Sequence, residues 1–177
     1  MLNIAVCDDE EMVLPYLCEQ ISSAFERVHM EVRIDSYSSS IKLRKTIENR
    51  ISYNVFFLDI DMEELDGFRL ASFIENKLEE AVLIFVSSKE EYVFSSFRHH
   101  PFSFIRKEKL RQDLEITVTD LQKKLKCENG NDRIILTDEQ QNSYEFPVQD
   151  VLYIEAQDKY ICIHTTNGNQ VIRSSLS

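Results

Sequence analysis

The sequence predicts an α/β protein: a doubly wound, five-stranded parallel sheet over residues 1–126, followed by a small, mainly antiparallel β module at 133–177. Two observations predict this fold class. Along residues 1–126, short and continuously apolar runs alternate with amphipathic helical patterns, as in a parallel sheet whose two faces are covered by helices. After a polar, glycine-containing stretch at 127–132, strand-like runs separated by turn residues follow one another without a helical period. We therefore expect two domains joined by a linker at 127–132.

The first half of the expected parallel sheet has three strands and two helices. The strands are predicted at 2–7, 31–37 and 55–59, where large apolar residues are concentrated. Apolar residues recur every three or four positions from about 10 to 28 and again from 41 to 51, which is the spacing of one buried helix face. Pro15 lies early enough in the first helix to be tolerated, and a serine among residues 38–40 can cap the second.

The second half adds two strands and three helices. The strands are predicted at 82–86 and 102–106. A turn at Asp66-Gly67 starts a helix that ends near Leu78, a short helix spans 90–97, and a last helix spans 110–125. In the C-terminal module, strand-like runs occupy 133–136, 143–148, 151–155, 160–165 and 170–173. About 45 residues make a thin independent core.

The composition argues against several classes of function. The chain has 177 residues, of which 43% are hydrophobic, and this is enough for a proper core. Its net charge of −11 argues against broad binding to phosphate backbones or anionic lipid. No apolar run approaches the length that spans a bilayer, and the N-terminus is acidic where a secretion signal would be basic. We expect a cytoplasmic protein without a membrane partner, whose four cysteines are reduced.

Polar residues stand where the predicted strands end. Asp8 and Asp9 follow the first strand and Asp59 ends the third, and these strands are neighbours in a flavodoxin-like order. Carboxylates this close repel each other unless a cation is present, and oxygen ligands suit Mg²⁺. We therefore hypothesise a bound Mg²⁺, with Asp59 as the nucleophile toward a phosphoryl donor. Ser87 and Lys107, at the ends of the fourth and fifth strands, would then bind the phosphoryl group.

Four motifs resemble the receiver domains of two-component response regulators: VCDDE the acidic pair, FFLDIDMEELDG the phosphoacceptor loop, FVSS the hydroxyl switch strand and FIRK the lysine strand. The resemblance covers about the first 120 residues. It implies Asp59 as phosphoacceptor, and Mg²⁺ bound by Asp59, by Asp9 directly, by the backbone carbonyl of Asp61 and by Asp8 through water. It further implies Ser87 as switch hydroxyl, Phe104 as switch aromatic and Lys107 as phosphate partner. Its implied partners are a sensor histidine kinase and a second copy in a phosphorylation-dependent homodimer. Self-dephosphorylation is the only enzymatic activity that it implies.

The sequence departs from that family at several positions. The family usually has proline soon after the phosphoacceptor and again after the lysine, where this chain has Glu63 and Glu108, so we expect a trans bond after Lys107. An aromatic side chain at Phe104 would also pack as an ordinary core residue. His99-His100 has no third ligand beside it, which favours a solvated helix end over a metal pair.

Two other interpretations of these acids compete with the receiver assignment. Asp8 or Asp9 taken alone would be interpreted as a helix cap, and only the acids together favour the functional site. Asp59 and Asp61 also form the DxD pattern of haloacid-dehalogenase-like phosphatases, in which the first Asp is the nucleophile and the second the acid/base. Those enzymes supply their metal-binding acids after the nucleophile, whereas here the acidic pair Asp8-Asp9 precedes Asp59 and no strand-end acid pair follows Lys107. The order of the parts therefore argues against the phosphatase.

The C-terminal module resembles the start of a LytTR DNA-binding domain through VLYIEAQDKYICIHTTNG, Val151 to Gly168. The resemblance implies that Lys159 contacts phosphate and that Tyr160 lies near bases, although both also suit an ordinary hairpin. The family's domain is about twice as long, so we expect this output module to be incomplete. From Asn131 onward there are three basic and seven acidic residues: Arg133, Lys159 and Arg173, against Asp132, Asp138, Glu139, Glu145, Asp150, Glu155 and Asp158. This balance is wrong for a complete DNA-binding surface. We expect a receiver that regulates transcription through this LytTR-like output, with a receiver that acts only through protein contacts as the alternative.

Overall fold

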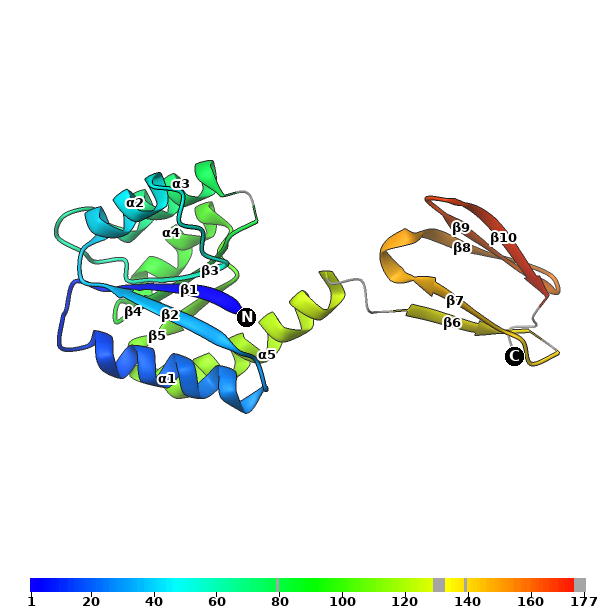
Figure 1. Cartoon of the computed structure of the whole chain (residues 1–177), viewed down its shortest axis with the longest axis horizontal. Helices are drawn as coiled ribbons and strands as arrows, with labels where there is room; N and C mark the ends of the chain where they lie inside the picture. The colour runs from blue at the N-terminus through cyan, green and yellow to red at the C-terminus, as the bar shows by residue number, and fades with distance from the viewer. Residues whose placement is uncertain (79, 129–132, 139, 174–177) are drawn as a thin grey trace. The chain divides into compact units, whose positions relative to one another are not determined.

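The computed structural model describes residues 1–78, 80–128, 133–138 and 140–173 of the chain. The chain divides into two compact units, Met1–Asp120 and Leu121–Ser177. Each unit is described here by itself (Figure 1). Among the described residues, no helix combines the length and the apolar character that crossing a membrane requires.

The first unit is built on the expected five-stranded parallel sheet. Its strands are β1 (Leu2–Cys7), β2 (Val32–Tyr37), β3 (Val55–Leu58), β4 (Val82–Ser87) and β5 (Ser103–Arg106). They lie in the order β2-β1-β3-β4-β5 and all neighbours pair in parallel. Each of the five lies within about two residues of its predicted place, and the flavodoxin-like order is confirmed. The central strands β3 and β4 are buried along their whole length, because helices cover both faces of the sheet.

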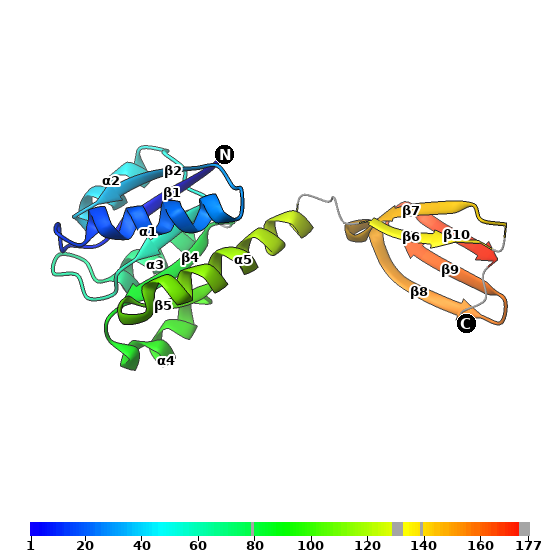
Figure 2. The same ribbon diagram turned by 90° about the horizontal axis from the view of Figure 1, so that it is seen from below.

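Five helices flank this sheet. They are α1 (Leu14–Arg27), α2 (Ser40–Glu48), α3 (Gly67–Lys77), the short α4 (Val93–Ser96) and α5 (Leu110–Glu128). Figures 1 and 2 show α1 and α5 together on one face of the sheet and α2 and α3 on the other. The predicted serine cap is Ser39, whose side chain accepts a hydrogen bond from the backbone N of Lys42.

Two helix boundaries differ from the prediction. The first helix starts at Leu14 rather than near residue 10, because residues 11–13 form a turn in which the backbone N of Val13 donates to the carbonyl of Glu10. The Asp8 carboxylate accepts the backbone N–H of Glu10 before this turn. The last helix continues to Glu128, so Cys127 and Glu128 are helical. The rest of the predicted linker, 129–132, lies outside the described residues.

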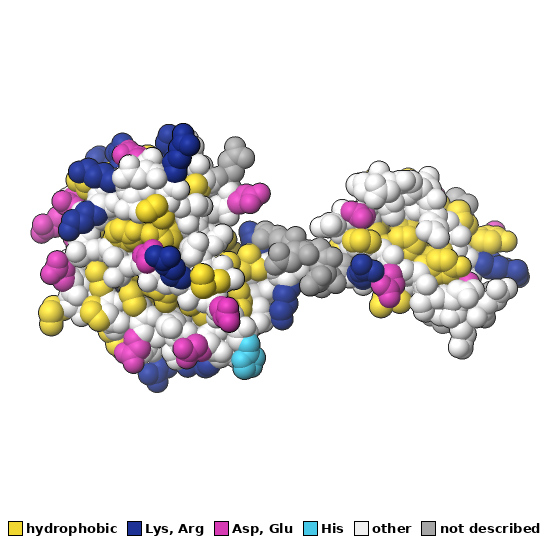
Figure 3. All heavy atoms as spheres, viewed as in Figure 1, with side chains coloured by type: hydrophobic (Ala, Val, Ile, Leu, Met, Phe, Trp, Pro, Cys, Tyr) yellow, Lys and Arg dark blue, Asp and Glu magenta, His cyan; other side chains and the backbone are white. Residues whose placement is uncertain are grey.

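The second unit contains the five predicted antiparallel strands. They are β6 (Arg133–Thr137), β7 (Ser143–Pro147), β8 (Val151–Gln157), β9 (Tyr160–Thr165) and β10 (Gly168–Arg173). The strands form a three-stranded sheet, β10-β9-β8, and a β6-β7 hairpin. Among the described residues of these strands, Phe146, Ile161, Ile163 and Ile172 form a buried hydrophobic cluster. Figure 3 shows hydrophobic side chains gathered between the sheet and the hairpin.

Candidate functional site

The pairing of β1 with β3 brings two of the predicted acids together. Cys7 and Leu58 are partners in the register, so Asp8 and Asp59 leave neighbouring strands at the same edge of the sheet. The backbone N of Asp59 donates to the carbonyl of Cys7 at 2.8 Å and prolongs that ladder by one residue. One carboxylate oxygen each from Asp8, Glu10 and Asp59 lies within 4.8 Å of the others. We call these three residues the acid cluster.

Asp59 is held by two hydrogen bonds. Its side chain is 5% exposed, with Oδ1 accepting from the backbone N of Ile60 at 2.7 Å and Oδ2 from Lys107 Nζ at 2.9 Å. Burial raises the pKa of Asp59 above its usual value, although the Lys107 ammonium partly opposes this and the Asp8 charge adds to it. Asp59 is therefore an oriented, poorly solvated carboxylate at the C-terminal edge of the parallel sheet.

Lys107 lies between the carboxylates of the acid cluster. Its Nζ is 2.6 Å from Asp8 Oδ2 and 3.6 Å from Glu10 Oε1, in addition to the contact with Asp59. Burial opposes the charged ammonium, but the hydrogen bond to Asp59 and the negative charges of Asp59 and Asp8 outweigh it and raise the pKa of Lys107. Lys107 is thus a fixed positive charge beside the predicted phosphoacceptor.

Asp8 has an oxygen without a well-directed hydrogen bond. The residue is fully buried, and its Oδ1 accepts from the backbone N of Glu10 at 3.0 Å. Its Oδ2 is close enough to Lys107 for an ion pair, but the contact lacks the direction of a hydrogen bond. One ammonium also leaves the three carboxylates of the acid cluster incompletely neutralised. An all-oxygen donor set with excess negative charge and an unsatisfied buried oxygen fits a small divalent cation such as Mg²⁺.

The other two predicted metal residues have different side-chain partners. Asp9 Oδ2 accepts from the backbone N of Glu63 at 2.9 Å, which ties the loop after β1 to the loop after β3. The Asp61 carboxylate forms an ion pair with Lys89. Neither carboxylate belongs to the acid cluster, so their roles as metal ligands, through the Asp9 side chain and the Asp61 carbonyl, stay predictions. Glu10 and Lys89 were not among the predicted site residues, although Glu10 continues the acidic run that contains Asp8 and Asp9.

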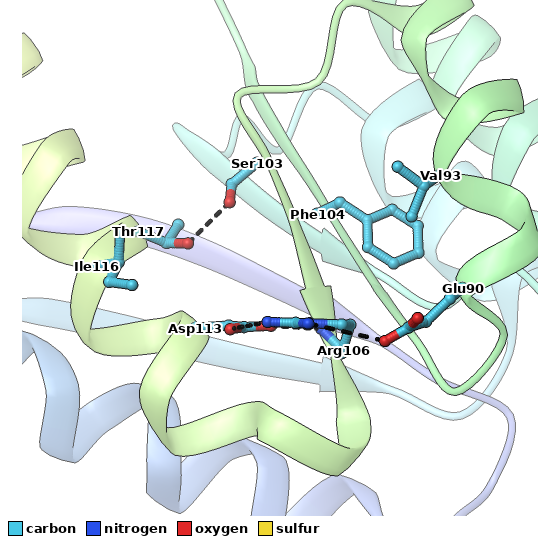
Figure 4. A pocket seen from close by; sticks show the side chains of 8 residues that line it. All are labelled: Glu90, Val93, Ser103, Phe104, Arg106, Asp113, Ile116 and Thr117. Atoms are coloured by element: carbon cyan, nitrogen blue, oxygen red, sulfur yellow. Dashed lines mark hydrogen bonds and ion pairs between the residues drawn. The ribbon is translucent and has the colours of Figure 1, made fainter.

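Ser87 and Phe104 come from the two strands beyond β3. Ser87 ends β4, is buried, and its Oγ accepts from the backbone N of Lys89 at 3.2 Å. Phe104 pairs with Phe85 across β4 and β5 and is half-buried. It lines a pocket of about 360 Å³, in which its ring points toward Val93 (Figure 4). Phe104 thus borders this pocket and also packs on the core, so its role as switch aromatic stays a prediction.

Gly67 determines how the loop after Asp59 closes. A Cβ on Gly67 would lie 2.1 Å from the Asp59 carbonyl oxygen, and the backbone N of Gly67 donates to the carbonyl of Ile60 at 2.9 Å. Only glycine permits this approach of the first turn of α3 to the loop after Asp59. The Asp66-Gly67 pair predicts a turn before a helix, but the close approach of Gly67 to the Asp59 carbonyl has no signal in the sequence.

The two adjacent histidines differ from the expected solvated helix end. His100 is exposed, as expected. His99 is 14% exposed, stacks on Phe68 with ring centroids 5.4 Å apart, and has its Nδ1 3.2 Å from Glu75 Oε2. The prediction is wrong for His99, because the α3 side chains offer it an aromatic face and a carboxylate. The absence of a cis peptide bond among the described residues confirms the trans bond after Lys107.

The two predicted DNA-contacting residues lie at the β8–β9 turn. Lys159 is exposed in the turn, which Asp158 closes with a φ of 50°. Tyr160 begins β9 and is also exposed. The geometry is that of a hairpin with two accessible side chains, so their contact with DNA stays a prediction.

The chain was compared with known proteins. Residues 4–119 match the family described as the response regulator receiver domain. A Yersinia pestis protein named an uncharacterized response regulatory protein is 29% identical over 135 residues, covering 76% of this chain. The chain spans 54% of that relative, about half its length. The transcriptional regulatory proteins YpdB of Escherichia coli K12 and LytR of Staphylococcus aureus N315 are each 22% identical, covering 99% and 98% of this chain and 74% and 70% of their own lengths.

Solved structures show the same fold for the first unit. The response regulatory domain of MrkE from Klebsiella pneumoniae superposes with a TM-score of 0.61 at 20% identity, over 70% of this chain and 97% of its own. The response regulator TrrA from Thermotoga maritima, solved in complex with Mg²⁺ and beryllofluoride, gives a TM-score of 0.53 at 23% identity, over 71% of this chain and 97% of its own.

Proposed function

The chain belongs to the response regulator receiver family of two-component systems, and from this premise we propose that Asp59 accepts a phosphoryl group from a sensor histidine kinase and that the β module carries the output to DNA. The observation that carries the first half is the geometry of Asp59. It is a buried carboxylate with one oxygen oriented by a backbone N–H and the other beside a lysine ammonium, next to a second buried acid. These are the features of a carboxylate set up to bind and keep a phosphoryl group.

The transfer step follows from these contacts. An Asp59 carboxylate oxygen attacks phosphorus, a P–O bond forms, and the bond from phosphorus to the donor breaks with its electron pair leaving on the donor. The backbone N–H of Ile60 holds Oδ1 and thereby orients the carboxylate. The Lys107 ammonium, whose Nζ is 2.9 Å from Asp59 Oδ2, exchanges the carboxylate for the incoming phosphoryl oxygens as its ion-pair partner. Ser87, at the end of β4, supplies a hydroxyl for a further phosphoryl oxygen, and Phe104 turns with it.

A divalent cation completes the site in this proposal. Mg²⁺ would be held by Asp59, Asp9, the carbonyl of Asp61 and, through water, Asp8, and it supplies positive charge that neutralises the approaching phosphate. The excess negative charge of the acid cluster and the unsatisfied Asp8 Oδ2 support a cation at this edge. The acid cluster adds Glu10 as a residue that can bind water on the metal.

The test is uptake of a phosphoryl group from a small acyl phosphate, followed by mass spectrometry of the intact protein. We expect about one group per chain, only with Mg²⁺, none in Asp59→Asn, and continued labelling in Lys107→Ala. Asp61→Asn is the matched control, since it keeps the backbone carbonyl. The Asp61→Asn variant should still be labelled. In a DxD phosphatase, the same substitution would remove the acid/base residue. Labelling that persists in Asp59→Asn would move the nucleophile elsewhere.

DNA binding is the second half of the proposal. Its support is the LytTR-like segment, the five antiparallel strands, the exposed Lys159 and Tyr160, and the names of curated relatives as transcriptional regulatory proteins. The acidic balance from residue 131 onward supports the alternative, in which the phosphorylated receiver acts through protein contacts, including homodimerisation. A mobility shift with and without acyl phosphate, using the intact protein, separates them. A Lys159→Ala change should weaken any DNA binding and leave phosphorylation intact.

A further inference from the structure

Arg106, the residue before Lys107, is bound to helix α5 by a multiple contact. The Asp113 carboxylate accepts three hydrogen bonds from it: Oδ2 from the Arg106 backbone N at 3.1 Å and from Nε at 2.8 Å, and Oδ1 from Nη2 at 2.8 Å. Figure 4 shows the guanidinium lying between Asp113 and Glu90. The guanidinium and the carboxylate meet in the two-pronged geometry that only arginine provides.

The two ion pairs of Arg106 differ in strength. The side chain of Asp113 is 11% exposed, and the hydrogen bonds from Arg106 outweigh its burial and lower the pKa of Asp113. The contact with Glu90 is 3.7 Å long and involves a side chain that is 65% exposed, so solvent screens it. Asp113 is the strong partner, and Glu90 is a natural comparison.

The Asp113 contact acts on the turn that carries Lys107. β5 ends at Arg106, and Lys107 begins a short 3-10 turn, Lys107–Lys109, that leads into α5. This turn contains no proline and has no side-chain cap. Arg106 contacts α5 through Asp113, whereas Lys107, the next residue, contacts the acid cluster. Fixing the backbone N and the side chain of Arg106 therefore fixes the starting point of the Lys107 side chain.

We propose that Asp113 is a positioning residue for the phosphoryl site: through Arg106 it holds Lys107 where its ammonium meets both the Asp59 side chain and a phosphoryl group bound there. This inference rests on the proposed function. The Lys107 side chain has four rotatable bonds, so its ammonium can occupy many positions. If the Lys107 backbone is not held in place, the ammonium spends a smaller fraction of its time in contact with a bound phosphoryl group. Asp113 itself touches neither the acid cluster nor the phosphoryl group.

The test measures binding of beryllofluoride, a phosphoryl mimic, to the full chain at saturating Mg²⁺ by fluorine NMR. Asp113→Asn keeps the shape but loses the charge and one acceptor, and it should weaken binding about tenfold. Glu90→Gln, the matched control on the same arginine, should leave binding unchanged. Arg106→Lys, which keeps the charge but loses the two-pronged contact, should weaken binding in the same direction and serves as the second variant if Asp113→Asn folds poorly.

A double-mutant cycle separates positioning from a general structural role. In a Lys107→Met background, Asp113→Asn should have no further effect on beryllofluoride affinity, because the group that it positions is gone. An equal loss in both backgrounds, or no loss with Lys107 present, overturns the inference. If the wild-type chain fails to bind beryllofluoride at all, the proposed function itself fails, and this outcome is distinct from the others.

Discussion

Replacing Lys107 with methionine should destabilise the first unit at neutral pH, because it removes the only ammonium that contacts the acid cluster in the described structure. Lys107 Nζ lies 2.6 Å from Asp8 Oδ2 and 2.9 Å from Asp59 Oδ2. These side chains are 0% and 5% exposed, so neither carboxylate can recover its hydration after the change. Methionine keeps the apolar stem, so the effect is mainly electrostatic.

The expected loss can be estimated from the burial of the pair. Removing one partner of a fully buried ion pair costs about 3–5 kcal/mol. One feature reduces the loss here: Glu10, the third carboxylate beside Lys107, is exposed and keeps its hydration. We therefore expect about 2–3 kcal/mol at neutral pH. Lys109→Met, in the same turn but at an exposed position, is the matched control and should have little effect.

The loss should depend on pH and on Mg²⁺. The folded-state pKa of Asp59 is raised above its usual value of 3.8, so its contribution to stability falls as the pH rises through the folded pKa. Lys107 lowers the folded-state pKa of Asp59, so in its absence that pKa is higher. The stability that Asp59 contributes is then lost at a higher pH. The cost of the substitution should thus shrink as the pH falls toward 3.8, and also on adding Mg²⁺. Lys107 itself stays charged, since its pKa is raised above 10.5.

The assay is urea unfolding followed by NMR signals of core residues in the first unit, which avoids averaging over the two units. Lys107→Met and Lys109→Met are compared with the wild type at neutral and acidic pH, with and without Mg²⁺. A Lys107→Met cost that equals that of Lys109→Met would refute the reasoning. So would a cost that stays the same across pH and Mg²⁺, because it would be steric rather than electrostatic.

Three other predictions test the same edge of the sheet. Asp9→Ala should weaken Mg²⁺ binding in calorimetric titrations far more than Asp8→Ala, because water can replace an indirect ligand; equal losses would contradict the assignment. Gly67→Ala should destabilise the chain in urea unfolding by about 1–3 kcal/mol, since its Cβ would meet the Asp59 carbonyl oxygen at 2.1 Å; an unchanged midpoint would show that the loop yields. Burial raises the pKa of Cys7 to about 12, so alkylation at mildly alkaline pH should label Cys162 well before Cys7. Peptide mass spectrometry maps the labelled cysteine, and equal labelling rates would contradict the burial of the Cys7 thiol.

Local patterns were sufficient for the architecture and for the central residues of the site. A continuously apolar run such as Val55–Leu58 can be recognised as a buried strand, because a strand covered on both faces needs apolar side chains at every position. Once the strands alternate with helices, the polar residues at their ends fall on one edge of a parallel sheet. Asp8, Asp59 and Lys107 could therefore be grouped without coordinates, and the structure brings them into contact.

Tertiary structure alone decided how the side chains around that group are used. The Asp9 carboxylate accepts a hydrogen bond from the backbone N of Glu63, 54 positions away. His99 is stacked on Phe68 instead of being exposed to solvent. Their partners come from other elements and leave no periodic signal near either residue. The Arg106–Asp113 contact shows the same limit, because seven positions separate two residues whose pairing depends on the angle between β5 and α5. A local pattern records which faces are buried, whereas the direction and partner of each polar group depend on distant segments of chain meeting in the folded state.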